Sequence, residues 1–122
     1  MQVKEVLKGA IEGTGDVAKD VMGTATDLVK EGTTDIGEIF HAVVELGKEG
    51  VGDVTSSVRD VFVGSVKALE ESGKTTEEAV EEVSTKASSV VGNVSEEGME
   101  DVSSAAQKGI EEAKEVVKKP IE

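Results

Sequence analysis

An 11-residue repeat runs from Val6 to the end of the chain and constrains its fold more than any other feature. Written in lines of eleven (VLKGAIEGTGD, VAKDVMGTATD, LVKEGTTDIGE, IFHAVVELGKE and onward), the sequence keeps its phase without insertion or deletion. Apolar residues favour the first, fifth and ninth columns, so their spacings are four, four and three. Eleven residues in three turns is about 3.67 residues per turn, close to the α-helical value. The pattern therefore predicts helices with an almost straight apolar stripe.

Helix propensity is weaker than this pattern. A β-strand would require alternation with a period of two, which is absent. Yet the chain contains 14 glycines and many valines and threonines, all of which form helices less readily than Ala or Leu. The helices are therefore expected to depend on a surface that packs against the stripe. Substantial disorder of the isolated chain is the alternative.

A turn is predicted near the middle of the chain. Gly73 suits the left-handed position that follows a helix C-terminus. Thr75 followed by Glu78 has the spacing of a capping box, which starts a new helix. Because the 11-residue phase continues through this segment, a single long helix is the alternative.

The fold class is expected to be all-α, with long amphipathic helices in an elongated helical hairpin or bundle. We expect one domain over residues 1–122, with a helical region over about 3–71, a turn over about 72–75 and a helical region over about 76–119. Glycines near 13, 32 and 47–52 could bend or break the first region. Pro120 marks the end of the second.

The composition is strongly acidic, with 26 Asp and Glu against 13 Lys and Arg and a net charge of −13. Nucleic acid is not an expected partner, because its binding requires Lys and Arg to neutralise phosphates. No segment approaches the roughly 20 apolar residues that span a bilayer, so no transmembrane segment is predicted. The N-terminus lacks a signal-peptide pattern. A soluble, cytoplasmic protein is the expectation.

Glu38 and His41 have the Glu-x-x-His spacing found in di-iron helical bundles. His41 is the only histidine, however, and both residues fall in polar columns of the repeat. The absence of cysteine also excludes thiolate metal sites and disulfides. We expect this pair to lie on an ordinary exposed face, and we predict no metal site.

The other chemical motifs are weak. Gly73-Lys74-Thr75 resembles the end of a phosphate-binding loop, but Ala68 stands where that motif needs glycine, and no strand precedes it. The many carboxylates have no predicted pocket that would separate their pKa values into an acid and a base. We therefore predict no catalytic residue, no cofactor and no enzyme activity.

The candidate functional residues are the apolar stripe. Small residues in its fifth column could allow close helix approach, or they could be poor helix formers on a loosely packed face. The stripe comprises Val6, Val17, Leu28, Ile39, Phe40, Val43, Val54, Val61, Phe62, Leu69, Val80, Val83, Val91, Val94, Val102 and Val116.

The repeat resembles those of the 11-residue amphipathic-helix proteins, namely group 3 late-embryogenesis-abundant proteins, synucleins, perilipins and exchangeable apolipoproteins. The segment from Ala105 to Glu115 (AAQKGIEEAKE) is similar to the embryogenesis-type unit. Lys48-Glu49-Gly50-Val51 matches the core of the synuclein repeat once. The resemblance implies a helical surface for lipid or for the protection of other macromolecules.

Two functions follow as hypotheses. The first is a non-enzymatic structural or interaction protein, whose stripe drives helix–helix assembly by self-association or by binding a helical protein partner. The second is a peripheral lipid-surface or stress-protection protein that folds into an amphipathic helix on an interface.

Overall fold

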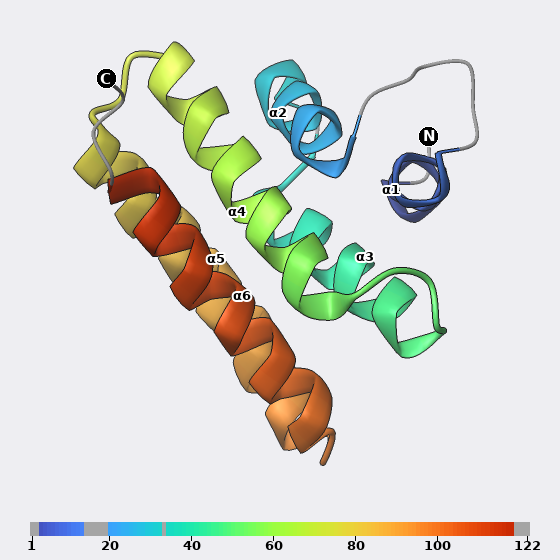
Figure 1. The fold of residues 1–122 in the computed structure, drawn as a ribbon. Coiled ribbons are helices and arrows are strands. Elements are labelled where there is room, and N and C mark those ends of the chain that lie inside the picture. Colours follow the sequence, from blue (N-terminus) through green and yellow to red (C-terminus); the bar gives the residue numbers. More distant parts are fainter. Residues whose placement is uncertain (1–2, 14–19, 33, 119–122) are drawn as a thin grey trace.

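The computed structural model describes residues 3–13, 20–32 and 34–118, and these residues form helices with no strand among them. The all-α prediction is therefore confirmed. The six helices of the described segments, coloured along the sequence in Figure 1, are α1 (Val3–Glu12), α2 (Val21–Glu31), α3 (Ile36–Lys48), α4 (Val54–Glu71), α5 (Thr76–Glu96) and α6 (Glu100–Lys118).

A short polar side chain caps the N-terminus of each helix from α2 to α5. The Asp20, Asp35 and Asp53 carboxylates accept hydrogen bonds from backbone N–H groups of the first turns of α2, α3 and α4. At α5 the predicted capping box is present: Thr75 Oγ1 accepts from the Glu78 N–H, and Glu78 Oε1 accepts from the Thr75 N–H. These caps satisfy backbone donors that the helix itself leaves without partners.

Glycine with a positive φ ends several of the helices, and Gly73 after α4 takes this conformation as predicted. Its N–H donates to the Glu70 carbonyl, and the Lys74 N–H donates to the Leu69 carbonyl. The same pair of bonds recurs at Gly98 after α5. Because a side chain would be strained at a positive φ, glycine makes these sharp endings available.

The two expected helical regions are therefore subdivided. The described part of residues 3–71 forms four helices, with ends near the glycines at which breaks were expected. Residues 76–118 form two helices rather than one, because the chain reverses at Gly98. Residue 119 and Pro120 lie outside the described residues.

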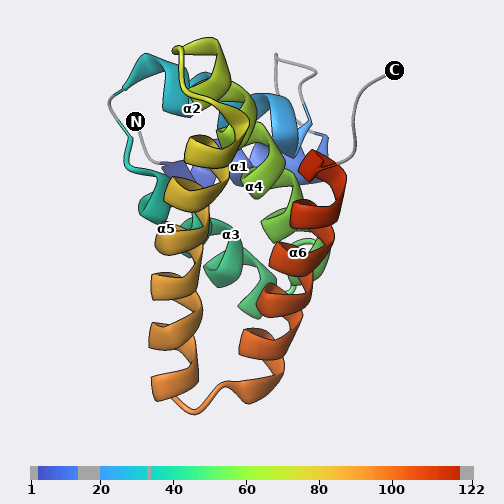
Figure 2. The ribbon, with the colours of Figure 1, turned by 90° about the vertical axis from the view of Figure 1, so that its left-hand side faces the viewer.

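Helix α4 is the centre of the molecule and packs against α2, α3, α5 and α6, whereas α1 packs on α2 and α3. Figure 2 shows α5 and α6 as an antiparallel pair whose connecting turn projects beyond α3 and α4. The expected elongated hairpin of residues 3–71 against residues 76–119 is therefore not confirmed, because α2, α3, α5 and α6 all pack around α4.

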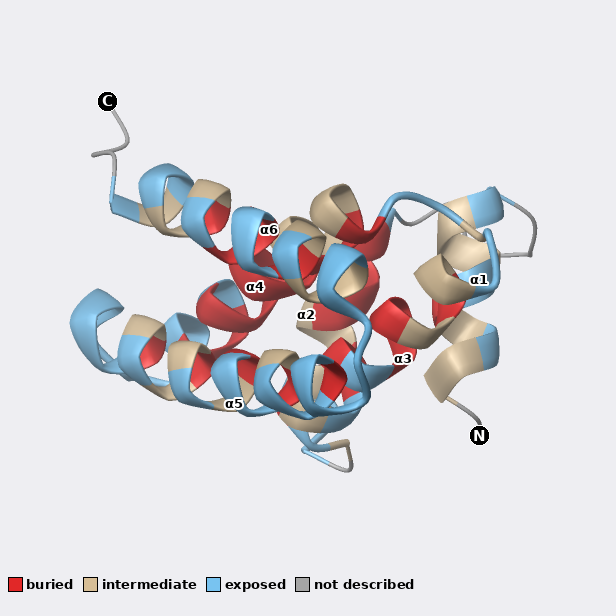
Figure 3. Cartoon of the chain, turned by 90° about the horizontal axis from the view of Figure 1, so that it is seen from below, coloured by how far each residue is buried: buried red, intermediate tan, exposed pale blue. Residues whose placement is uncertain are grey.

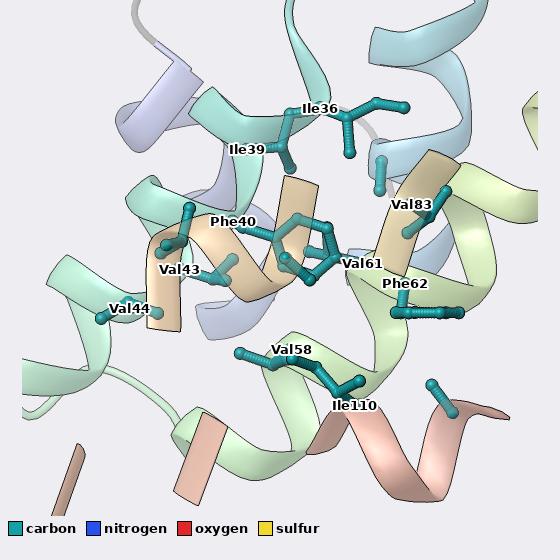
Figure 4. Packing of buried hydrophobic residues seen from close by; sticks show 14 of the residues in the cluster. Ile36, Ile39, Phe40, Val43, Val44, Val58, Val61, Phe62, Val83 and Ile110 are labelled. Atoms are coloured by element: carbon teal, nitrogen blue, oxygen red, sulfur yellow. The ribbon is translucent and has the colours of Figure 1, made fainter. Parts of the chain in front are cut away.

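The hydrophobic core lies where α4 meets its neighbours. Seen from below in Figure 3, the buried faces of α5 and α6 are turned toward α4, and their outer faces are exposed. At its centre Phe40 and Phe62 form an edge-to-face pair, with ring centroids 6.4 Å apart and an interplanar angle of 67°. Val58, Val61 and Ile110 pack around them (Figure 4).

Candidate binding groove

Most of the predicted stripe is buried inside the chain. Val116 is the exposed exception, with 49% of its surface accessible, and Val17 lies outside the described residues. Val6, Val80, Val91 and Val102 are half-buried. The buried members are Leu28, Ile39, Phe40, Val43, Val54, Val61, Phe62, Leu69, Val83 and Val94.

The core is also wider than the stripe. Leu7, Val44, Leu46, Val58 and Ile110 are almost completely buried although none was included in the stripe. A helix inside a globular protein buries a broad arc rather than a single line of positions. Val58 stands in the ninth, apolar column of the repeat, and the other four stand in columns beside the apolar ones.

A groove of about 720 Å³ lies between α2, α4, the first turn of α5 and the C-terminal end of α6. Val63 and Val66 of α4 are almost fully buried and line it, and Val116 is exposed at its α6 side. Its volume lies within the range of small-ligand sites, about 300–1,000 Å³, and half of its lining residues are apolar. The lining residues are Met22, Val63, Val66, Lys67, Glu70, Thr76, Glu77, Val116, Val117 and Lys118.

A close contact between α2 and α4 fixes one side of this groove. A side chain at Gly64 would place its Cβ 2.4 Å from the Met22 carbonyl oxygen, so only glycine permits this approach. The Thr26 hydroxyl lies 2.9 Å from the Gly64 carbonyl oxygen and 3.0 Å from that of Met22, and it can donate to either. Met22 and Val63 are thereby brought to the same surface from separate parts of the chain.

A similar contact joins α6 to α4. A Cβ at Gly109 would lie 2.5 Å from the Thr55 carbonyl oxygen, while the Thr55 hydroxyl donates to the Ala105 carbonyl at 2.9 Å. Arg59 Nη1 also lies 3.2 Å from Glu112 Oε1. Gly109 belongs to the small-residue column of the repeat, so at this position the small residue permits close helix approach.

The groove carries charged groups of both signs. Lys67 Nζ lies 3.8 Å from the Met22 sulfur, a weak acceptor, and has no carboxylate partner within the described segments. Lys118 has none there either. The Glu70 carboxylate accepts a hydrogen bond from the Thr76 hydroxyl. The Lys67 side chain is exposed, so its ammonium group is hydrated and can be reached by an anionic ligand, whereas the Glu70 carboxylate beside it has a side-chain partner.

The predicted acidic column lies largely at the surface, where several members form ion pairs between helices. Glu71 pairs with Lys30 at 3.1 Å, and Glu49 pairs with Lys4. Exposed pairs of this kind contribute little to stability. Asp60 differs, because partial burial raises the pKa of its carboxyl above the ordinary value and the neighbouring Arg59 offsets this only in part.

The Glu38 and His41 side chains are both exposed on α3. His41 Nε2 lies 3.7 Å from Glu45 Oε1, beside a cavity of about 280 Å³ that Glu96 and Glu97 also line. Across the described segments, no group of three or more His, Cys, Asp or Glu is arranged to hold a metal ion. At Gly73-Lys74-Thr75 the chain forms the turn before α5, and the Thr75 side chain is engaged in the helix cap.

Comparison of the chain with protein-family models, with curated proteins and with solved structures gives no match. Among the described helices, none is long and apolar enough to cross a membrane. Assignment of a function therefore rests on the groove and its side chains. The sequence pattern missed this groove because Met22, Val63 and Val117 come from three different helices, and no local spacing relates them.

Proposed function

We propose that this chain is a non-enzymatic binding protein, in which the apolar stripe assembles the helices and the groove binds an aliphatic ligand. The observation that carries the proposal is the group of apolar residues that line the groove, which the described helices leave uncovered. Each methylene moved from water into such a lining gains about 0.8 kcal/mol. A flexible alkyl chain is therefore the occupant that this surface favours.

The stripe is largely buried within the fold of a single chain. This burial favours ligand binding in the groove over a function in which the stripe itself binds another protein. Phe40, Phe62 and Val43 are already covered by neighbouring helices, and exposing them would forfeit the packing that holds α4 in place. Val116 and Met99 are the large apolar residues that stay exposed among the described residues. Of these two, Val116 lies at the groove.

The test is a titration with octyl, decyl and dodecyl glycerol ethers below their aggregation concentrations, followed by calorimetry. We expect saturable binding to the full chain, with affinity rising by up to about fourfold per added methylene. Val116→Asp should weaken binding by about tenfold or more, because it places a charge at the groove wall. Met99→Asp is the matched control and should bind as the unaltered chain does.

Circular dichroism of the same samples separates the alternatives. Helix content in buffer that is independent of dilution is expected for a fold with its own core. A coil spectrum that becomes helical only on vesicles would replace this proposal with the lipid-surface function. Helix content that falls on dilution would instead favour self-association. Equal effects of Val116→Asp and Met99→Asp on ligand binding would show that the groove is not the binding site.

A further inference from the structure

The charges at the groove indicate what head group the aliphatic ligand carries. We propose that the groove takes a single alkyl chain bearing an anionic head group, with Lys67 as the main anchor for that head. This inference rests on the proposed function, since it concerns the same groove. It goes further by naming the charge of the ligand and the side chains that select it.

The first argument is the state of Lys67. Acidic residues outnumber basic ones by two to one in this chain, and Lys4, Lys30, Lys48, Lys74 and Lys86 all pair with carboxylates. Lys67 lines the groove, and its ammonium group contacts a thioether. An anionic head would supply the charge-assisted hydrogen bond that this contact does not.

The second argument is the state of the carboxylates at the same groove. Glu70 is engaged by the Thr76 hydroxyl. Glu77 lies in the first turn of α5, where the positive end of the helix dipole favours a negative charge. Both carboxylates thus have a favourable contact within the fold, although they keep their negative charge, whereas Lys67 and Lys118 lack a carboxylate partner within the described segments.

The acidic surface of the rest of the molecule does not abolish the preference of the groove for an anionic head group. At physiological ionic strength charges farther than about 8 Å from the head group are largely screened. The nearby side chains of the groove then determine which head group is preferred. Lys8, Lys108 and Lys114 also have no carboxylate partner among the described residues, but they do not line the groove.

The experiment compares laurate with the neutral 1-lauroylglycerol, which has the same chain, and with the cationic dodecyltrimethylammonium. We expect laurate to bind about tenfold more tightly than the neutral compound, and the cation to bind most weakly. Lys67→Gln should lower the affinity for laurate much more than the affinity for 1-lauroylglycerol, so that the ratio of the two affinities falls toward one. Lys108→Gln removes the same charge from an exposed position on α6 outside the groove and should change neither.

The outcomes distinguish this inference from the proposed function. Equal binding of laurate and 1-lauroylglycerol, unaffected by Lys67→Gln, would overturn the head-group inference while the aliphatic groove stands. Tighter binding of the cation would also overturn it, because the carboxylates would then dominate. Absence of saturable binding by all three compounds would overturn both.

Discussion

Helices α3 and α4 bury large side chains, whereas the hairpin of α5 and α6 buries mostly small ones. Phe40, Phe62 and Leu46 are almost inaccessible to solvent in the first region. The hairpin contributes chiefly alanines and valines to the core, with Ile110 as its largest fully buried residue. Since stabilisation follows the apolar area removed from water, α3 and α4 supply most of it.

The hairpin compensates by close approach of its backbone. Gly109 lets α6 contact the α4 backbone directly, and Thr55 hydrogen-bonds across the same interface. At its far end the hairpin projects beyond this interface, where Lys48 of α3 reaches Glu97 at 3.7 Å. The two regions thus pack in different ways. Large side chains pack between α3 and α4, whereas a small residue allows the backbones of α4 and α6 to come into contact.

The largest effect should come from the aromatic pair. Phe62→Ala would leave a cavity at the centre of the core and is expected to lower the free energy of unfolding by about 3–5 kcal/mol. Val83→Ala, at an equally buried hairpin position, loses only two methyl groups and should cost about 1.5 kcal/mol or slightly more. Urea denaturation of both variants measures the difference. Equal losses would show that the two regions contribute alike.

Gly109→Ala should have the next largest effect. The added methyl would collide with the Thr55 carbonyl and push α6 from α4, with a cost of about 1–3 kcal/mol despite better helix propensity. The control is Gly92→Ala in α5, where the new Cβ would meet nothing within 4 Å. That variant should gain up to about 1 kcal/mol. If both glycines tolerated Ala equally, close backbone approach would not hold the hairpin.

Loss of the α5 cap should be smaller and confined to the hairpin. Thr75→Ala removes the acceptor for the Glu78 N–H and is expected to cost about 1 kcal/mol. Thr75→Ser keeps the hydroxyl and should retain most of the stability. Amide hydrogen exchange would locate the effect in the first turn of α5, and protection lost equally in α3 would contradict the regional assignment.

The smallest effect concerns pH. Burial raises the pKa of Asp60 above its ordinary 3.8, so the folded chain holds this proton more tightly than the unfolded chain does. The protonated Asp60 carboxyl contributes its full stabilisation when the pH is below 3.8, and this contribution is lost as the pH rises through the pKa of the folded state. As the pH is raised from below 3.8 through the folded pKa of Asp60, the unaltered chain should lose this contribution and Asp60→Asn should not. The thermal midpoint of Asp60→Asn should therefore decrease less over that pH range than the midpoint of the unaltered chain.

Glu78 in the hairpin provides the comparison of opposite sign. Its backbone and side-chain hydrogen bonds with Thr75 lower the pKa of its carboxyl. The stability it contributes is present above the ordinary value of 4.5 and is lost as the pH falls through the lower folded pKa. Glu78→Gln should therefore show a smaller loss of stability on acidification, and matching pH profiles for the two variants would contradict these assignments.

Local signals in the sequence predicted the helices and one of their boundaries. The period of the repeat excluded strands, and Gly73, Thr75 and Glu78 located the turn between α4 and α5. Further signals of the same kind went unused: Asp35 before Ile36 and Asp53 before Val54 are helix caps followed by buried aliphatic residues. The continuous phase of the repeat obscured them, because it suggested helices longer than those that form.

The sequence by itself determined that the chain is helical, where its polar faces lie, and that a helix ends near Gly73 and another begins after Thr75. These properties depend on residues within one or two turns of each other, which interact however the rest of the chain is arranged. Only the tertiary structure decided that Phe40 meets Phe62, that Gly109 contacts Thr55, and that Met22, Val63 and Val117 line one groove. Such contacts join helices far apart in the chain, and an apolar stripe specifies that a face must be covered without specifying which helix covers it.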